Sequence, residues 1–220
     1  MPQCGAWRDS ARRTHWLGEA ALWSLAGGII GGRVAYILPN WSQYAARPSA
    51  ILDLWRGGLA FHGALFGGAA AIWLYAQIHF PSFWDLADLA ALGLPLGQAF
   101  GWLGALFHGS NYGVVAYKGW AWELPDLYGI TVPRFPTQAV GSAIALVLFL
   151  LQLLLSRRRM PSGAAFSIYL LSNSLAYFLL EFTRGDGAAH WGPLRLAQVV
   201  YLLETLLSLG LCASLWRARR

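Results

Sequence analysis

The chain contains six stretches of predominantly apolar residues, each close to the roughly 20 residues that a helix needs to cross a bilayer core. Their approximate bounds are 16–38, 57–80, 83–107, 136–156, 163–182 and 193–216. Since lipid cannot satisfy free backbone groups, such stretches are typical of transmembrane helices. The sequence therefore predicts an all-α, polytopic integral membrane protein. We expect about six transmembrane helices around a central polar cavity, in a single domain over residues 1–220.

The composition agrees with a membrane protein. Charged residues make up 12% of the chain, against about 25% in a soluble domain. The 12 Trp and 25 Gly are typical of membrane interfaces and of close helix contacts. A net charge of +6 would suggest nucleic acid in a soluble protein. Here the arginines flank apolar stretches, so we expect membrane lipids as partners and no nucleic acid.

Three arginine clusters predict the orientation. They precede the first span, separate the fourth from the fifth, and end the chain: Arg8, Arg12, Arg13, Arg157, Arg158, Arg159, Arg217, Arg219 and Arg220. With six spans all three clusters lie on one side, which the positive-inside rule makes cytoplasmic. We therefore expect both termini in the cytoplasm and the loops 39–56, 108–135 and 184–192 outside. No cleavable signal peptide is visible, because the first apolar stretch is too long for one.

A lone histidine, His62, lies in the glycine-rich run 57–68 at the start of the second span. An ionisable side chain at membrane depth is a candidate functional group, and the glycines let other backbones approach it. The alternative is a structural histidine that hydrogen-bonds a carbonyl. His62 is nevertheless the side chain that we expect to carry chemistry.

Further polar residues gather toward the outward ends of the spans. An arginine or glutamate inside a span must pair or face a polar cavity, and Arg33 with Glu181 is one candidate pair. Arg33 and Arg184 could instead reach the interface from span ends, and Gln98 could bridge helices. A polar, arginine-containing cavity suits an anionic lipid head group. The full set of candidates is Arg33, Tyr36, Arg56, His62, Gln98, His108, Ser110, Asn111, Tyr112, Thr137, Gln138, Glu181 and Arg184.

Several motifs predict packing and capping. Glycines four residues apart favour close helix contacts. They occur at Gly27–Gly31 and Gly63–Gly67, and along the third span at Gly93, Gly97, Gly101 and Gly104. The run 82–85 is a Ser-x-x-Asp helix start, so Asp85 and Asp88 are expected to cap that helix, and Pro95 to kink it. No metal-ligand spacing appears, and we expect no metal or cofactor.

The order of the polar motifs resembles the prolipoprotein diacylglyceryl transferase family over about residues 17–204. The matching segments are Gly31-Gly32-Arg33-Val34-Ala35-Tyr36, 58–67, 95–101, Gly104, Asn111-Tyr112-Gly113, Pro136-Thr137-Gln138 and Glu181-Phe182-Thr183-Arg184. The resemblance implies transfer of a diacylglyceryl group from phosphatidylglycerol to the lipobox cysteine of a preprolipoprotein, at the bacterial inner membrane. It also implies a further N-terminal span, so we expect a shortened chain or a misassigned start.

This sequence departs from the family pattern at five positions. Trp102 and Tyr177 stand where the family has arginines, Ala105 where it has asparagine, Ser110 where it has glutamate, and Phe135 where it has histidine. Tryptophan donates one hydrogen bond but carries no charge. Arg33, Arg184 and Arg56 are the remaining candidates for holding a phosphate.

The resemblance then implies a role for each candidate. His62 would handle the thiol proton or orient the thiol, and Arg33 and Arg184 would hold the phosphate. The residues expected to line the phospholipid site are Tyr36, Gln98, Gly101, Gly104, His108, Tyr112, Gly113, Gln138 and Glu181. The alternative is a catalytically degenerate member that binds lipid or lipoprotein. A small transporter would need a pore and usually an inverted repeat, and no repeat is visible.

Overall fold

The computed structural model describes residues 3–79 and 82–217, and the chain folds as two compact units, 1–87 and 88–220. Side chains are described from Trp16 onward, except those of Arg56 and Trp216. Five helical segments of the described chain are long and apolar enough to cross a membrane: Trp16–Ala46, Phe83–His108, Thr137–Leu155, Ala164–Thr183 and Leu196–Leu215. The prediction of a helical membrane protein is confirmed.

The six-span count stays a prediction. Five predicted spans correspond to the segments above, with ends that differ by a few residues. The second corresponds to helix α3 (Phe61–His79), which has 19 residues and is not among those five segments. It begins later than expected because Gly57 and Gly58 both adopt positive φ angles, which end helical geometry there.

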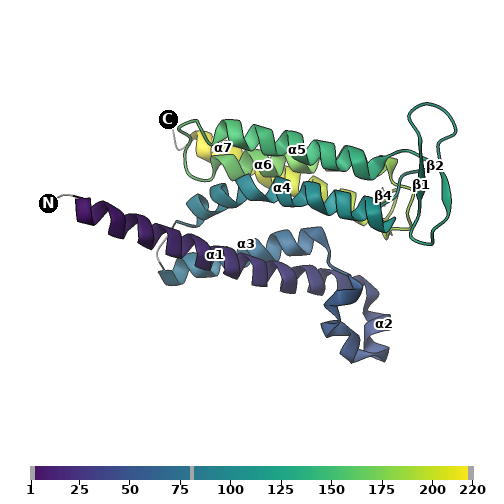
Figure 1. Ribbon diagram of the computed structural model, residues 1–220, viewed down its shortest axis with the longest axis horizontal. Helices are drawn as coiled ribbons and strands as arrows, with labels where there is room; N and C mark the ends of the chain where they lie inside the picture. Colours follow the sequence, from purple (N-terminus) through teal and green to yellow (C-terminus); the bar gives the residue numbers. More distant parts are fainter. Residues whose placement is uncertain (1–2, 80–81, 218–220) are drawn as a thin grey trace. The chain divides into compact units, whose positions relative to one another are not determined.

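The first unit is a helical hairpin with a folded connection. Helix α1 (Gln3–Ile37) lies beside α3 (Figure 1). The connection contains η1 (Leu38–Asn40), α2 (Trp41–Ala46), η2 (Pro48–Leu52) and η3 (Leu54–Arg56). The two helices are antiparallel, because Gly31 faces Gly63 while Gly27 faces Gly67. A Cβ atom built at Gly31 would overlap the Gly63 carbonyl oxygen. The close packing predicted from these glycines is confirmed.

The second unit contains the remaining helices and two small hairpins. Helices α4 (Phe83–His108), α5 (Thr137–Leu155), α6 (Ala164–Leu180) and α7 (Leu196–Arg217) carry its apolar residues. Strands β1 (Trp122–Pro125) and β2 (Thr131–Arg134) pair antiparallel, as do β3 (His190–Trp191) and β4 (Leu194–Arg195). A short turn, η4 (Glu181–Thr183), follows α6.

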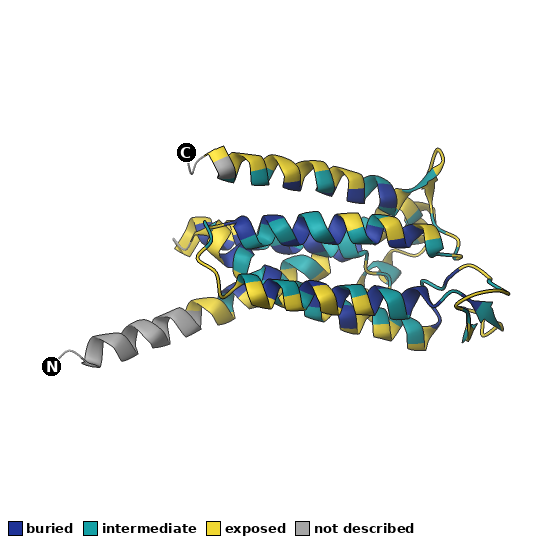
Figure 2. Cartoon of the chain, turned by 90° about the horizontal axis from the view of Figure 1, so that it is seen from above, coloured by how far each residue is buried: buried dark blue, intermediate teal, exposed yellow. Residues whose placement is uncertain are grey.

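The core of this unit lies among α5, α6 and α7. Leu148, Tyr177, Leu180 and Tyr201 are buried there, and Trp102 of α4 packs against them. Several leucines of α7 are exposed, and Figure 2 shows exposed positions in yellow along this helix, which ends at the C-terminus. Apolar side chains facing outward are expected of a helix that contacts lipid.

Asp88 differs from its predicted role. Its carboxylate accepts hydrogen bonds from the backbone N–H groups of Gly163 and Phe166, at 2.7 and 2.8 Å. Asp88 therefore caps the start of α6 rather than that of its own helix. A carboxylate at a helix N-terminus is favoured by the free N–H groups and by the helix dipole.

The glycine stripe of α4 is also different from the prediction. Within the second unit as described, no heavy atom lies within 4 Å of a Cβ built at Gly93, Gly97, Gly101 or Gly104. The close packing predicted for this stripe is therefore not formed in that unit. Pro95 is accommodated inside a continuous helix.

Candidate functional site

The predicted site residues fall into two groups. Arg33, Tyr36 and His62 belong to the first unit. The second unit holds Gln98, Gly101, Gly104, His108, Tyr112, Gly113, Gln138, Glu181 and Arg184. Each group has its own geometry, and the cavity expected to unite them stays a prediction.

Arg33 is the centre of a dense set of hydrogen bonds in the first unit. Its side chain is 7% exposed. Nε donates to the carbonyl of Ile51 at 2.9 Å, Nη1 to Gly57 and Gly58 at 2.7 and 3.0 Å, and Nη2 to Ala50 and Asp53 at 2.6 and 3.0 Å. A guanidinium has five N–H donors, and all five are used here.

This arrangement gives Arg33 a structural role. The five carbonyl groups belong to residues 50–58 of the connection between α1 and α3, which is built from short helical segments of three to six residues. Arg33 and Glu181 each find partners within their own unit, and a pair between them stays a prediction. To bind a phosphate, Arg33 would have to release a main-chain carbonyl.

His62 lies in the first turn of α3, and its side chain is half-buried. Its ring makes an edge contact with that of Phe61, with centroids 5.6 Å apart. The helix start is held by the N–H of Ala60, which donates to the carbonyl of Gly32 at 3.0 Å. Tyr36 packs against Gly58, where any side chain would meet the tyrosine ring. Arg33, Tyr36 and the backbone before His62 are thus held together.

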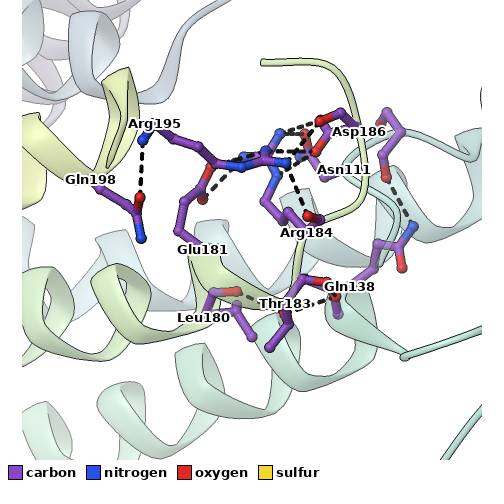
Figure 3. A network of polar contacts seen from close by, with 11 residues as sticks. Asn111, Gln138, Leu180, Glu181, Thr183, Arg184, Asp186, Arg195 and Gln198 are labelled. Carbon is purple, nitrogen blue, oxygen red and sulfur yellow. Dashed lines mark hydrogen bonds and ion pairs between the residues drawn. The ribbon is translucent and has the colours of Figure 1, made fainter. Parts of the chain in front are cut away.

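The second unit carries a group of four charged side chains that we call the charge cluster: Glu181, Arg184, Asp186 and Arg195 (Figure 3). Arg184 Nη1 lies 3.0 Å from Glu181 Oε1, and its Nε donates to Asp186 Oδ1 at 2.9 Å. Arg195 Nη1 donates to the same Asp186 oxygen at 3.0 Å and lies 3.6 Å from Glu181 Oε1. Two guanidinium groups therefore share two carboxylates, and the cluster has no net charge.

Exposure differs among these four side chains. Glu181 is 4% exposed, against 12% for Arg195, 15% for Arg184 and 19% for Asp186. Burial by itself would raise the pKa of Asp186, but the hydrogen bonds and charges of Arg184 and Arg195 outweigh burial and lower that pKa. Burial alone would lower the pKa of Arg184, but hydrogen bonding to Asp186 and the charge of Glu181 raise it on balance. Both shifts favour the charged forms of Asp186 and Arg184.

Backbone pairing fixes the cluster in place. Gly113 bridges Arg184 in antiparallel fashion, and the N–H of Gly185 donates to the carbonyl of Tyr112 at 2.8 Å. A Cβ at Gly113 would overlap the carbonyl oxygen of Phe135, which explains the glycine. Asn111, in a left-handed conformation with φ 52°, accepts from Arg184 Nη2 at 2.9 Å. The segment 111–113 thus forms one wall of the cluster.

The other predicted residues of this unit lie around that wall or away from it. Gln138 is fully buried and donates to the carbonyl of Ser110 at 2.9 Å. The ring of Tyr112 lies 4.4 Å from the guanidinium carbon of Arg134. Gln98 accepts from the hydroxyl of Tyr169 at 3.3 Å, far along α4 from the exposed His108. Gly101 and Gly104 are exposed.

Trp102 and Tyr177, at the two positions where the resemblance leads us to expect arginines, contact each other. Their rings stack with centroids 5.6 Å apart, and Tyr177 donates to the carbonyl of Gly141 at 2.7 Å. The ring of Tyr201 on α7 also stacks with that of Tyr177, with centroids 6.2 Å apart. An aromatic stack therefore occupies the space among α4, α5, α6 and α7.

Two members of the charge cluster were missed by sequence reasoning. Asp186 and Arg195 lie in and just after the loop 184–192, where charged residues are ordinarily solvated. The sequence feature that could have indicated Asp186 is its position two residues after Arg184, within reach of the Arg184 guanidinium. Arg195 gave no local signal, because only the β3–β4 hairpin brings it back to Asp186.

The apolar helices and the buried charge cluster at the end of α6 define a multi-pass helical membrane protein. The profile of the prolipoprotein diacylglyceryl transferase family matches residues 4–214, and the chain belongs to that family. Its relatives from Nostoc, Pseudomonas aeruginosa and Symbiobacterium thermophilum are bacterial proteins, and each is named phosphatidylglycerol–prolipoprotein diacylglyceryl transferase.

Three relatives illustrate the similarity. The chain is 34% identical to the Nostoc protein over 211 residues, which cover 91% of this chain and 74% of the relative. Identity to the Pseudomonas aeruginosa protein is 31% over 231 residues, with coverage of 98% and 85%. Identity to the Symbiobacterium thermophilum protein is 35% over 222 residues, with coverage of 97% and 81%.

Proposed function

We propose that this protein transfers a diacylglyceryl group from phosphatidylglycerol to the lipobox cysteine of a preprolipoprotein, in the bacterial inner membrane. The observation that carries the proposal is the match to the transferase family over nearly the whole chain, with relatives that bear the name of this reaction. The five apolar segments support the location. We propose further that both termini lie in the cytoplasm, which reporter fusions to each end would test.

The reaction makes two demands on the protein. The cysteine sulfur forms a bond to the glycerol carbon, and the bond from that carbon to the phosphate oxygen breaks, so glycerol phosphate leaves. A thiolate is the nucleophile, so the thiol proton needs an acceptor. The departing phosphate needs positive charge or hydrogen-bond donors. No metal or cofactor enters this scheme.

His62 is our candidate for the proton. An unperturbed imidazole has a pKa of about 6.5 and can accept a proton near neutral pH. The side chain lies in the first turn of α3, where Arg33 and Gly32 hold the preceding backbone. A fixed backbone is what an acid–base group requires.

For the phosphate we propose Arg184 and Arg195. Arginine suits phosphate because its donors match the oxygens in pairs. In the charge cluster both guanidinium groups contact Asp186, the most exposed of the four side chains. An incoming phosphate would take the place of this carboxylate, while the buried Glu181 continues to balance one charge. Arg33 and Arg56 remain candidates from the sequence, but the donors of Arg33 are already used.

A second candidate function is a degenerate family member that binds lipid or lipoprotein without catalysis. The aromatic stack of Trp102 and Tyr177 favours it, because two uncharged rings fill positions where the family pattern has arginines. Such a protein would keep the fold and lose transition-state stabilisation.

The test is complementation. The chain is expressed in cells depleted of their own diacylglyceryl transferase, and lipid attachment to a reporter preprolipoprotein is measured. We expect attachment that is lost in His62→Ala and kept in His79→Ala, a control at the other end of the same helix. Absence of attachment, with activity appearing only when Trp102→Arg and Tyr177→Arg are combined, would establish the degenerate member instead.

A further inference from the structure

The connection between α1 and α3 presents large apolar side chains that nothing in the first unit, as described, covers. Trp55 is 99% exposed and Leu52 is 85% exposed, and Leu38 and Trp41 are 66% and 57% exposed. Fully exposed tryptophan in water is unfavourable, and large exposed apolar patches usually mark a contact surface. The question is which partner covers Leu52 and Trp55.

The hydrogen bonds of Arg33 fix the depth of these side chains. Arg33 lies four residues before Ile37, where α1 ends, which is about 6 Å along a helix at 1.5 Å per residue. Its guanidinium contacts three carbonyl groups that precede Trp55 in the sequence, those of Ala50, Ile51 and Asp53. It also contacts two that follow, those of Gly57 and Gly58. The chain around Leu52 and Trp55 is therefore held beside the last turn of α1.

The length of the apolar part of α1 fits a last turn at a bilayer surface. The apolar segment begins at Trp16, and from there to Ile37 the helix has 22 residues, about 33 Å at 1.5 Å per residue, close to the ~30 Å hydrocarbon core. Helix α3 then runs back antiparallel from Phe61. The residues between the two helices thus lie at the boundary between acyl chains and head groups, where tryptophan is enriched.

The backbone of this segment fits the same depth. Irregular backbone near the hydrocarbon region is tolerated only where its polar groups are satisfied by protein or cavity water. Here five carbonyl groups are satisfied by one buried arginine. A lysine ammonium has only three N–H donors, so it could not satisfy five carbonyl groups.

We propose that Leu52 and Trp55 insert into the head group–acyl boundary of the phospholipid bilayer, on the side where α1 ends, and that Arg33 is the residue that holds them there. The partner is the lipid surface itself. The proposal does not depend on catalytic activity, because it concerns how the first unit contacts the membrane.

The test uses the full chain in vesicles of phosphatidylethanolamine and phosphatidylglycerol. Cys4→Ser and Cys212→Ala remove the native thiols, and Trp55→Cys accepts an environment-sensitive fluorophore. Lys118→Cys, in the exposed loop before β1, is the matched control. Quenching is measured with aqueous iodide and with lipids that carry a nitroxide near the head group or near the acyl terminus.

We expect the label at position 55 to be quenched several-fold more by the shallow nitroxide than by the deep one, and little by iodide. The label at position 118 should respond mainly to iodide. Adding Arg33→Lys should move the position 55 label toward iodide quenching, with helix content unchanged by circular dichroism. Strong iodide quenching of the position 55 label in the chain that keeps Arg33 would overturn the proposal. Protection of this label from every quencher would also overturn it, because a protein surface would then cover position 55.

Discussion

The rings of Trp102 and Tyr177 lie parallel within 2°, with centroids 5.6 Å apart. One ring comes from α4 and the other from α6, so two residues 75 positions apart depend on each other. Trp102 also covers Gly141, where a Cβ would lie 2.5 Å from the indole. The two departures from the family pattern are therefore one packing unit rather than two independent changes.

We predict that this pair is energetically coupled. In a double-mutant cycle of Trp102→Leu and Tyr177→Leu, the double variant should lose less stability than the sum of the singles, by about 0.5–1.5 kcal/mol. Thermal unfolding in detergent gives the three values. Strict additivity would show that the stacking contributes nothing.

Gly63 provides a second prediction. Its backbone touches that of Gly31, so Gly63→Ala forces α1 and α3 apart and should cost about 1–3 kcal/mol of unfolding free energy. Gly18→Ala is the matched control on α1, because no heavy atom of the described chain lies within 4 Å of its Cβ position. There the better helix propensity of alanine should leave stability unchanged or raise it by up to about 1 kcal/mol. Equal effects at both glycines would contradict the close contact.

Asp186 tests the proposed phosphate site. Asp186→Asn removes the carboxylate that competes for Arg184 and Arg195, so binding of phosphatidylglycerol should tighten several-fold. Asp126→Asn is the matched control, since Asp126 pairs with Arg134 instead, at 3.0 Å. Lipid binding to the purified chain is the measurement. Unchanged binding in Asp186→Asn would remove Arg184 and Arg195 from the proposal.

The same aspartate makes stability depend on pH. Its pKa in the folded chain is lowered, so the folded state favours the charged form. The pairing therefore stabilises the fold at pH values above the unfolded pKa of about 3.9. That contribution is lost as the pH falls through the lower, folded value. We expect Asp186→Asn to reduce the melting temperature similarly at pH 7 and pH 5, with the difference vanishing in strong acid. A difference that disappears already by about pH 5 would contradict the lowered pKa.

Asn173 gives a prediction of opposite sign. It is fully buried on α6, and neither its amide nitrogen nor its amide oxygen has a hydrogen-bond partner in the described chain. Because an unpartnered buried polar group costs about 1–3 kcal/mol, Asn173→Leu should raise thermal stability. Ser174→Ala, which removes a 2.9 Å hydrogen bond to Thr205, should lower it. Destabilisation by Asn173→Leu would reveal a bound partner at this amide.

Local patterns in the sequence predicted the local parts of the fold. Apolar length located α5 and α6 to within a few residues. The four-residue spacing of Gly63 and Gly67 predicted a close helix contact, which the structure forms with α1. Glu181 and Arg184 were found together because they lie in one turn.

Relationships between distant segments were not predictable. Asp88 looks like the cap of its own helix, and only the folded chain brings it to Gly163. The sequence suggested that Arg33 pairs with Glu181, reaches the interface or holds a phosphate. It could not suggest main-chain carbonyl acceptors, because every residue type carries a carbonyl group. Arg195 joins the charge cluster through the β3–β4 hairpin, whose two-residue strands are too short to give a clear sequence pattern.

The balanced charges of the cluster at the end of α6 have a consequence for how an anionic lipid reaches it. Two positive and two negative groups produce a field that decays quickly with distance, so attraction acts only at contact. The encounter is then governed by two-dimensional diffusion within the leaflet and by local concentration there. Its rate should be nearly independent of ionic strength, unlike the capture of soluble ligands by a strongly charged surface.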